Sequence, residues 1–284
     1  MEPSSWATPW AVRSDARRVL ERVRSLRQRG PRVVLDAPRE GLGFGNFLYF
    51  WLHADQARRA GTPEWVVVPD GLTPWLDAYP ALRALSLSAR EVRASDRRVF
   101  HWNSRFGIDF TRDQLHRFMA CYLVSDAEPT TEASPDVAVN VKRGVYYSAP
   151  HFRGTYSFDI AAYLGLALER MAQREPVGAV TVISDDLDWC ELKLDDLFRR
   201  SAGTVTYLRT SPHEQFASLS RFRRIVGTNT TFSYWGAYVS SWRFPAVGHV
   251  VMPKFHGRLG DEPWAYQLDP DWDIVEDLPG GWDA

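Results

Sequence analysis

Two basic side chains, Lys142 and Arg143, follow a short hydrophobic run in the middle of the chain, and their chemistry is that of an anion site. Alternation along an extended strand puts Asn140 and Lys142 on one face, with Arg143 at or past the strand end. Two adjacent cations without an acidic neighbour in the sequence suit a diphosphate, whose oxygens accept charge-assisted hydrogen bonds. The alternative is a solvated strand end from which both side chains extend into water. We predict that Asn140, Lys142 and Arg143 are catalytic.

A second polar group, Ser184, Asp185 and Asp186, ends another apolar run, and a helical pattern begins directly after it. Its oxygens can accept hydrogen bonds from the base or ribose of a nucleotide. Ser and Asp also cap helices well, so a purely local role is the alternative. We predict that all three residues contact a nucleotide ligand.

A third polar group contains Asn229, Thr230, Thr231 and Ser233, between an apolar run that ends near Val226 and an amphipathic segment. The N–H groups of a helix N-terminus, with hydroxyl groups beside them, form a ready site for an anion. We therefore predict that a phosphate binds here. An ordinary Thr-capped helix is the alternative.

A glycine-rich turn contains Gly41, Gly43, Gly45 and Asn46. It follows an apolar run near the start of the chain and leads into an amphipathic segment. Glycine lets the backbone approach a ligand closely, and Asn46 can cap a helix while its amide points outward. Gly43, Gly45 and Asn46 are therefore predicted ligand contacts. The alternative is a tight turn alone, because the spacing is not that of a dinucleotide-binding fingerprint.

The elements that must position these groups follow from the hydrophobic pattern. Apolar runs alternate with amphipathic segments along almost the whole chain, which is typical of parallel strands covered by helices on both faces. The predicted strands are residues 31–38, 64–69, 137–143, 179–184, 203–208, 223–227 and 246–252. The predicted helices are residues 14–29, 46–60, 111–124, 157–173, 187–200, 211–220 and 231–241. The fold class is therefore α/β, and the second half has the pattern of a Rossmann-like unit.

Two domains are expected for 284 residues of which 45% are hydrophobic. The polar, proline-containing segment 124–136 is the best candidate for the linker. We predict an N-terminal α/β domain over residues 1–130 and a C-terminal Rossmann-like domain over residues 131–284. A ligand crevice is expected between them, at the carboxyl ends of the strands.

The composition excludes several classes of protein. A formal net charge of -1 and a pI near 6.7 give no overall reason to expect nucleic acid as a partner. Two cysteines are too few for a disulfide framework or a structural zinc site of thiolates. No apolar stretch approaches the roughly 20 residues of a membrane helix, and the first residues lack the pattern of a signal peptide. We expect a cytoplasmic protein without an integral membrane segment.

In this order and spacing, the four groups resemble motifs of the α-1,2-fucosyltransferases of glycosyltransferase family 11. That family has Gly-x-Gly-Asn-Gln, then His-x-Arg-Arg-Gly-Asp-Tyr, then Ser-Asp-Asp with Trp-Cys, and then Asn-Ser-Thr-Phe-Ser-Trp-Trp-Gly-Ala. The similar segments here are Gly43–Asn46, Asn140–Tyr146, Ser184–Asp186 with Trp189–Cys190, and Asn229–Ala237. With the trailing segment Val250–Gly257, the resemblance spans about residues 34–257.

The resemblance implies a GT-B architecture, in which two Rossmann-like domains with parallel sheets face a central cleft. It implies an inverting transfer from GDP-fucose or a related GDP-sugar to a hydroxyl group of a glycan or a glycosylated small molecule. The N-terminal domain would take the acceptor and the C-terminal domain the nucleotide sugar. No metal and no cofactor besides the donor are implied. The string Asp186-Leu187-Asp188 matches the Asp-x-Asp of metal-dependent glycosyltransferases, but its second Asp lies inside a predicted helix.

The chain departs from the family pattern at Asn140, Lys142 and Val145, where the family has His, Arg and Asp. Replacing a planar guanidinium by an ammonium group changes how two phosphate oxygens are held, so the donor sugar stays open. No carboxylate is an obvious general base for the acceptor. The candidates are Asp36, Glu40, His151 and Asp159, and the alternative is that the leaving diphosphate takes the proton. A nucleotide-binding or scaffolding protein that has lost catalysis is the second reading of the whole chain.

Overall fold

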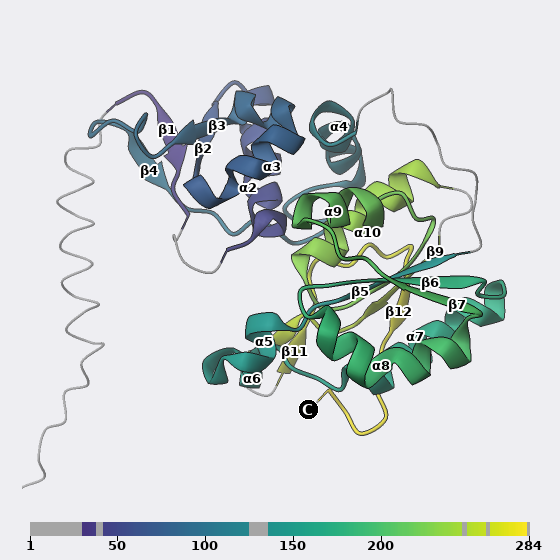
Figure 1. Ribbon diagram of the computed structural model, residues 1–284. Coiled ribbons are helices and arrows are strands. Elements are labelled where there is room, and N and C mark those ends of the chain that lie inside the picture. Colours follow the sequence, from purple (N-terminus) through teal and green to yellow (C-terminus); the bar gives the residue numbers. More distant parts are fainter. Residues whose placement is uncertain (1–29, 38–41, 125–135, 246–248, 260–261, 283–284) are drawn as a thin grey trace, which may run out of the picture.

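Two parallel sheets form the framework of the protein (Figure 1). The computed structural model describes residues 30–37, 42–124, 136–245, 249–259 and 262–282. The first sheet has the order β3 (Ser86–Ser88), β2 (Glu64–Val68), β1 (Val33–Leu35) and β4 (Arg97–Val99). The second has the order β12 (Asp273–Val275), β9 (His249–Pro253), β8 (Arg224–Gly227), β5 (Val137–Val141), β6 (Ala179–Ser184) and β7 (Thr204–Tyr207). Every paired strand within these two sheets runs parallel to its neighbour.

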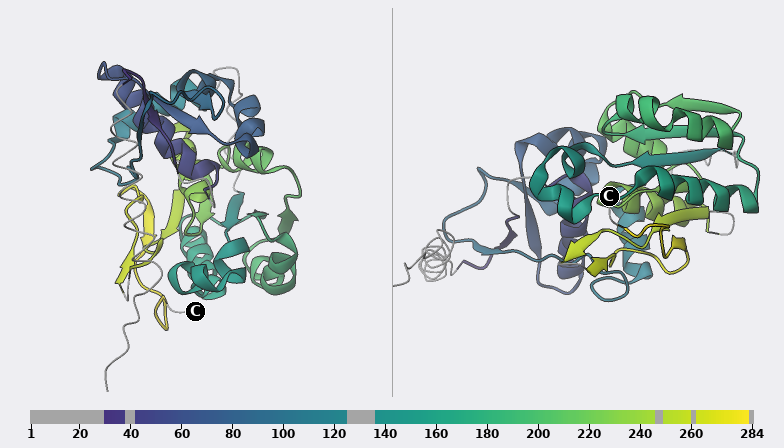
Figure 2. Two further views of the ribbon diagram at one scale, coloured as in Figure 1. Left: turned by 90° about the vertical axis from the view of Figure 1, so that its left-hand side faces the viewer. Right: turned by 90° about the horizontal axis from the view of Figure 1, so that it is seen from below.

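Helices cover the sheets, as the amphipathic segments predict. The N-terminal helices are α2 (Phe44–Arg59), α3 (Thr73–Ala78) and α4 (Arg112–Tyr122), with 3-10 turns at Asp70–Leu72 and Pro80–Leu85. The later helices are α5 (Gly144–Ser148), α6 (Pro150–Tyr156), α7 (Ile160–Arg174), α8 (Leu187–Ser201), α9 (Pro212–Leu219) and α10 (Thr231–Arg243). A small antiparallel pair, β10 (Gly257–Leu259) and β11 (Glu262–Trp264), follows β9. In Figures 1 and 2, α7 and α8 lie on one face of the second sheet, and α9 and α10 lie on the face toward the first sheet.

The strand order of the second sheet marks the expected place of a ligand. Starting from its first strand, β5, the chain adds β6 and β7 on one side and then β8, β9 and β12 on the other. This is the order of a Rossmann fold, whose direction reverses between the first and the fourth strand. Ligands of such sheets bind outside the carboxyl ends of the strands at this reversal. The point lies between β5 and β8, where Lys142 and Thr228 follow the strands.

One apolar core joins the two sheets. Its buried side chains include Trp51 of α2, Phe118 of α4, and Trp235 of α10. The rings of Phe118 and Trp235 lie 5.7 Å apart, and those of Tyr49 and Trp235 lie 5.0 Å apart. A second core fills the other face of the second sheet, beneath α7 and α8. Helix α10 therefore packs against both the first sheet's helices and its own sheet.

The structure confirms the α/β fold with two parallel sheets. The predicted strand 137–143 ends at Val141, because Arg143 leaves the extended conformation with φ −130° and ψ −77° and begins α5. The sequence pattern missed α5 and α6, which are too short to show a helical period. The predicted helix 14–29 and residues 125–135 of the predicted linker lie outside the described residues. The boundary between residues 130 and 131 stays a prediction. Within the described residues, every helix is too short or too polar to cross a lipid bilayer.

Because one core contains side chains of both sheets, we expect the protein to unfold in a single cooperative step. Calorimetry and tryptophan fluorescence during heating should give the same midpoint. Trp235→Ala removes a fully buried ring and should lower the free energy of unfolding by about 3–5 kcal/mol. Two separate transitions, of which this substitution shifts only one, would contradict the shared core.

Candidate active site

A cavity of about 530 Å³ opens at the carboxyl ends of β5 and β6, between the two sheets. Both halves of the chain line it. From the first half come Gly43, Phe44, Gly45, Asn46, Leu72 and Trp75. From the second half come Asn140, Val141, Lys142, Val145, Tyr146, Ser184, Asp185, Pro212, Gln215, Thr230, Thr231 and Phe232. The cavity thus collects residues from all four groups that the sequence singles out.

Among the described residues that line the cavity, Lys142 is the one with a basic side chain. Its backbone N–H donates to Thr228 Oγ1 at 2.8 Å, which holds it beside the end of β8. Its Nζ lies 2.6 Å from Asp185 Oδ2 and 5.3 Å from the centre of the Tyr146 ring. The side chain is about one quarter exposed. The ammonium group therefore faces the cavity while paired with a carboxylate of the neighbouring strand.

Arg143 lies differently from its neighbour and is absent from the cavity lining. Its guanidinium lies 4.0 Å from the centre of the Trp189 ring, and its Nε lies 3.2 Å from Asp186 Oδ2. The Arg143 backbone N–H donates to Asp185 Oδ1 at 2.9 Å. The two basic residues have no acidic neighbour in the sequence, but the fold places Asp185 and Asp186 beside them.

Asn140 is buried and its amide joins three elements. Its Nδ2 donates to the Ile183 carbonyl of β6 at 3.1 Å, and its Oδ1 accepts from Ser233 Oγ at 2.6 Å. Ser233 is completely buried and does not line the cavity. Through these hydrogen bonds, Asn140 and Ser233 hold the start of α10 against β5.

The N-termini of two helices meet at the cavity. Thr230 caps α10, with its Oγ1 accepting from the Phe232 N–H at 3.3 Å. Gly45, in the first turn of α2, approaches so closely that an added Cβ would lie 2.7 Å from the Thr231 carbonyl carbon. Asn46 lines the cavity from inside α2, where Gly43 takes the cap position. Positive ends of two helix dipoles therefore adjoin the same cavity.

Asn229, by contrast, is fully buried and does not line the cavity. Its Nδ2 donates to the Tyr156 and His256 carbonyl oxygens at 2.8 and 3.0 Å. Burial lowers the pKa of His256 to about 3, so its ring is neutral at physiological pH. Asn229 therefore ties the turn before α10 to the end of α6 and to the segment after β9.

The polar group after β6 faces a second hollow of about 380 Å³. Ser184, Asp185 and Gln215 line both this hollow and the main cavity, and Arg209 lines this hollow alone. Asp186 caps α8 by accepting from the Trp189 N–H at 3.3 Å. The Asp188 carboxylate is largely exposed and pairs with Arg209 at 2.9 Å. Both carboxylates of the Asp-x-Asp string thus have protein partners.

Aromatic rings form a wall of the cavity that the sequence analysis did not single out. Phe44 and Trp75 stack with ring centres 3.8 Å apart and planes 8° from parallel. Phe232 lines the cavity beside them. Tyr146 lies opposite, and burial raises the pKa of its hydroxyl, which keeps it protonated and able to donate a hydrogen bond. Such rings give an apolar surface for the face of a base or a sugar.

The expected general bases do not line the cavity, and Glu40 lies outside the described residues. Asp159 caps α7 by accepting from the Ala162 N–H at 2.9 Å. Asp36 pairs with Arg98 at 2.6 Å, and His151 lies on α6 against Phe152. Among the described residues, Asp185 is the one carboxylate of the cavity lining.

Two parallel sheets that face a ligand cleft define an α/β protein of the GT-B type. The sequence model described as glycosyl transferase family 11 matches residues 109–243, just under half of the chain. This segment runs from the residues before α4 to the end of α10 and contains Lys142, Asp185 and Thr230. Over this segment the chain is therefore similar to the family 11 glycosyltransferases, which agrees with the resemblance seen in the motifs.

Similar proteins are vertebrate fucosyltransferases. Human galactoside alpha-(1,2)-fucosyltransferase 1 is 29% identical over 151 residues, which are 51% of this chain and 40% of the human protein. The protein of the same name from Aotus azarae is 30% identical with the same coverage. Mouse galactoside 2-alpha-L-fucosyltransferase Sec1 is 27% identical over 175 residues, 60% of this chain and 45% of the mouse protein. The matches thus span less than half the length of these relatives.

Two glycines of the cavity give a matched pair of variants. In Gly45→Ala the new Cβ meets backbone atoms of α10, so we expect the free energy of unfolding to fall by about 1–3 kcal/mol. Gly43→Ala meets nothing within 4 Å, so it should cost only the poorer N-cap preference of alanine, about 0.5–1 kcal/mol. Urea denaturation measures both. Equal stability of the two variants would show that α2 and α10 do not pack this closely.

Proposed function

We propose that the protein is a glycosyltransferase that moves a sugar from a GDP-activated donor, GDP-fucose or a related GDP-sugar, to a hydroxyl group of a glycan or a glycosylated small molecule. One observation carries the proposal: the cavity lies where the strand order of the second sheet reverses, within the segment that matches family 11. The names of the relatives, which are galactoside fucosyltransferases, support fucose and a sugar acceptor.

The donor diphosphate is proposed to lie at the start of α10, beside Lys142. The dipole of α10 and the ammonium group of Lys142 favour negative charge at this point. The nucleoside then extends past Ser184 and Asp185 into the second hollow. An acidic residue at the end of the second strand is also where Rossmann folds hold a ribose hydroxyl. The acceptor enters from the side of α2 and α3, along the wall of Phe44 and Trp75.

The pair of Lys142 and Asp185 gives the site a way to respond to the donor. Without a ligand, the carboxylate holds the ammonium group at 2.6 Å. A diphosphate carries more negative charge than one carboxylate and competes for Lys142. Asp185 then becomes available to accept hydrogen bonds from the nucleoside. Both side chains are partly exposed, so solvent screens their charges during the exchange.

We propose that the transfer is inverting and independent of metal, with the departing diphosphate stabilised by Lys142 and by the helix termini. These groups are fixed before the reaction, so they need little reorganisation as charge develops. Asp185 lies on the donor side, next to Lys142, and is poorly placed to deprotonate an acceptor that enters past α2. The proton of the acceptor is therefore proposed to reach the diphosphate oxygens.

A binding or scaffolding protein that has lost catalysis is the second candidate. The favouring observation is that Lys142 and Arg143 both pair with carboxylates, while the half-exposed Val145 lines the cavity where the family has Asp. Slow hydrolysis of a GDP-sugar by the purified protein distinguishes the two. The enzyme releases sugar and GDP, whereas the binding protein retains GDP without turnover.

Guanine nucleotides are expected to stabilise the protein more than uridine nucleotides, because the segments that resemble those of GDP-sugar enzymes line the donor side of the cavity. Thermal melts with GDP, UDP and ADP at equal concentration measure this. A ligand present at 100 times its Kd stabilises by about 2.7 kcal/mol, which is a readily measured rise of the Tm. A larger rise of the Tm with UDP than with GDP would contradict the proposal of a GDP-sugar donor.

Lys142→Ala should weaken GDP binding by about 10–100-fold, because a charge-assisted contact is worth about 1.5–3 kcal/mol. Arg143→Ala is the matched control, since its guanidinium lies on Trp189 outside the cavity lining, and it should change binding only a few-fold. Isothermal titration calorimetry measures both. If neither variant changes GDP binding by more than about twofold, this strand end is solvated surface. A larger loss for Arg143→Ala would reverse the roles of the two residues.

A further inference from the structure

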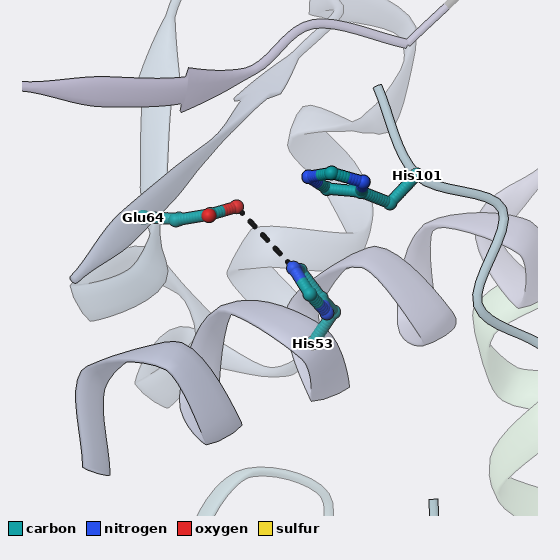
Figure 3. Close-up of side chains that lie close together, drawn as sticks. All are labelled: His53, Glu64 and His101. Atoms are coloured by element: carbon teal, nitrogen blue, oxygen red, sulfur yellow. Dashed lines mark ion pairs between the residues drawn. The ribbon is translucent and has the colours of Figure 1, made fainter. Parts of the chain in front are cut away.

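A second group of chemically capable side chains lies away from the cleft and consists of His53, Glu64 and His101 (Figure 3). Among the described residues, these are the one group of three whose ligand atoms all lie within 4.8 Å of one another. His53 comes from α2, Glu64 from the start of β2, and His101 from the segment after β4. Figure 3 shows the three side chains converging on one point.

The distances nearly fit a tetrahedral metal ion. Zinc binds imidazole nitrogen and carboxylate oxygen at about 2.0–2.2 Å, which sets its ligand atoms roughly 3.3 Å apart. His53 Nε2 and Glu64 Oε2 are 3.4 Å apart, so these two atoms already have the required spacing. The ligand nitrogen of His101 lies within 4.8 Å of both atoms, so it must move closer by at most about 1.5 Å, which a side-chain rotation can supply.

The same two atoms lack hydrogen-bond partners. His53 Nε2 and Glu64 Oε2 are both shielded from solvent, and neither makes a hydrogen bond. The two atoms face each other at 3.4 Å, as an ion pair when His53 is protonated, but the contact does not complete a hydrogen bond for either of them. The centre of the His101 ring lies 4.9 Å from that of the His53 ring. His101 therefore brings a third nitrogen close to these two atoms. A cation between the three side chains would satisfy all of them.

A neighbouring amide orients the His53 ring. Asn103 Nδ2 lies 2.9 Å from His53 Nδ1, on the side of the ring away from Glu64. Metal-binding histidines usually have such a partner on the second nitrogen, where it selects the tautomer. With a metal at Nε2, Nδ1 carries the proton, and the Asn103 amide turns its oxygen toward it.

We propose that His53, Glu64 and His101 bind one Zn²⁺ ion, with water as the fourth ligand. Two imidazoles and one carboxylate are a known ligand set of zinc, whereas Mg²⁺ and Ca²⁺ prefer oxygen ligands. The site joins α2 to β2 and to the segment that follows β4, so the ion stabilises this part of the fold. His53 stands seven residues after Asn46, the last residue of α2 that lines the cavity, which is about 10 Å along the helix axis. The ion is therefore separate from the sugar transfer.

Zinc binding is tested on tag-free protein stripped with EDTA and dialysed. We expect one Zn²⁺ per chain by competition with a chromogenic chelator, and a rise of the Tm with Zn²⁺ but not with Mg²⁺. Co²⁺ in place of Zn²⁺ should give the visible absorption of a tetrahedral site. Failure to bind stoichiometric Zn²⁺, or an equal rise of the Tm with Mg²⁺, overturns the proposal.

Variants locate the ion. Asn103→Ala should weaken Zn²⁺ binding by about 10–100-fold, the usual effect of removing a partner of a ligand, and His101→Gln should weaken it more. His101 is half-buried and outside the regular elements, so circular dichroism should show an intact fold. His116→Ala, a half-buried histidine of α4 outside the group, is the control and should bind as the parent does. Unchanged binding in His53→Ala/His101→Gln would overturn the site.

Zinc removal also separates this inference from the proposed function. Below the Tm of the stripped protein, EDTA is expected to leave turnover of a GDP-sugar unchanged while abolishing the zinc-dependent rise of the Tm. Loss of turnover that Zn²⁺ restores only when His53 and His101 are intact would mean that the ion acts in catalysis, which contradicts a separate structural role.

Discussion

The rest of the structure depends on the contact between the first turns of α2 and α10. Gly45 lets the two backbones meet, and Asn140 fixes the start of α10 through Ser233. Further along, Trp235 of α10 enters the core beneath α2 and α4. The same helix pair therefore closes the cavity at one end and joins the sheets at the other.

This contact also decides how charge is arranged at the cleft. Two helix termini and one ammonium group adjoin the cavity, and one carboxylate compensates them. Both charged side chains are partly exposed, so solvent screens this arrangement and Asp185 adds a direct ion pair to it. The second basic residue, Arg143, is held on Trp189 and shapes the loop that carries Lys142. Gly144 belongs to the same arrangement, because its φ of +23° and an added Cβ 2.2 Å from Asp185 exclude a side chain there.

The alternation of apolar and amphipathic segments was enough to predict the α/β class and the long elements, because burial on both faces of a parallel sheet requires that pattern. This pattern did not predict the three-residue strands β3 and β12, because so few residues do not show a recognisable alternation of apolar and polar side chains. The motifs identified the strand ends of the site, and the cavity contains members of all four. The sequence could not predict which residue of each motif lines the cavity. Asn229 and Ser233 turned out buried, while Asp185 came to lie against Lys142 through the pairing of β5 with β6.

Helix α2 shows why the histidine group could not be found from spacing. His53, Glu64 and His101 are separated by 11 and 37 positions in the sequence. They meet only because α2 packs across β2 and the segment after β4. The face of α2 that carries His53 is therefore constrained at both ends: Gly45 must approach α10, and His53 must approach Glu64. The Gly45 contact fixes the end of α2 that carries Phe44 and Asn46, and the proposed zinc ion would fix the opposite end. Because the residues of the cavity are held by the contact with α10, removal of the ion is expected to lower stability and to leave the acceptor wall in place.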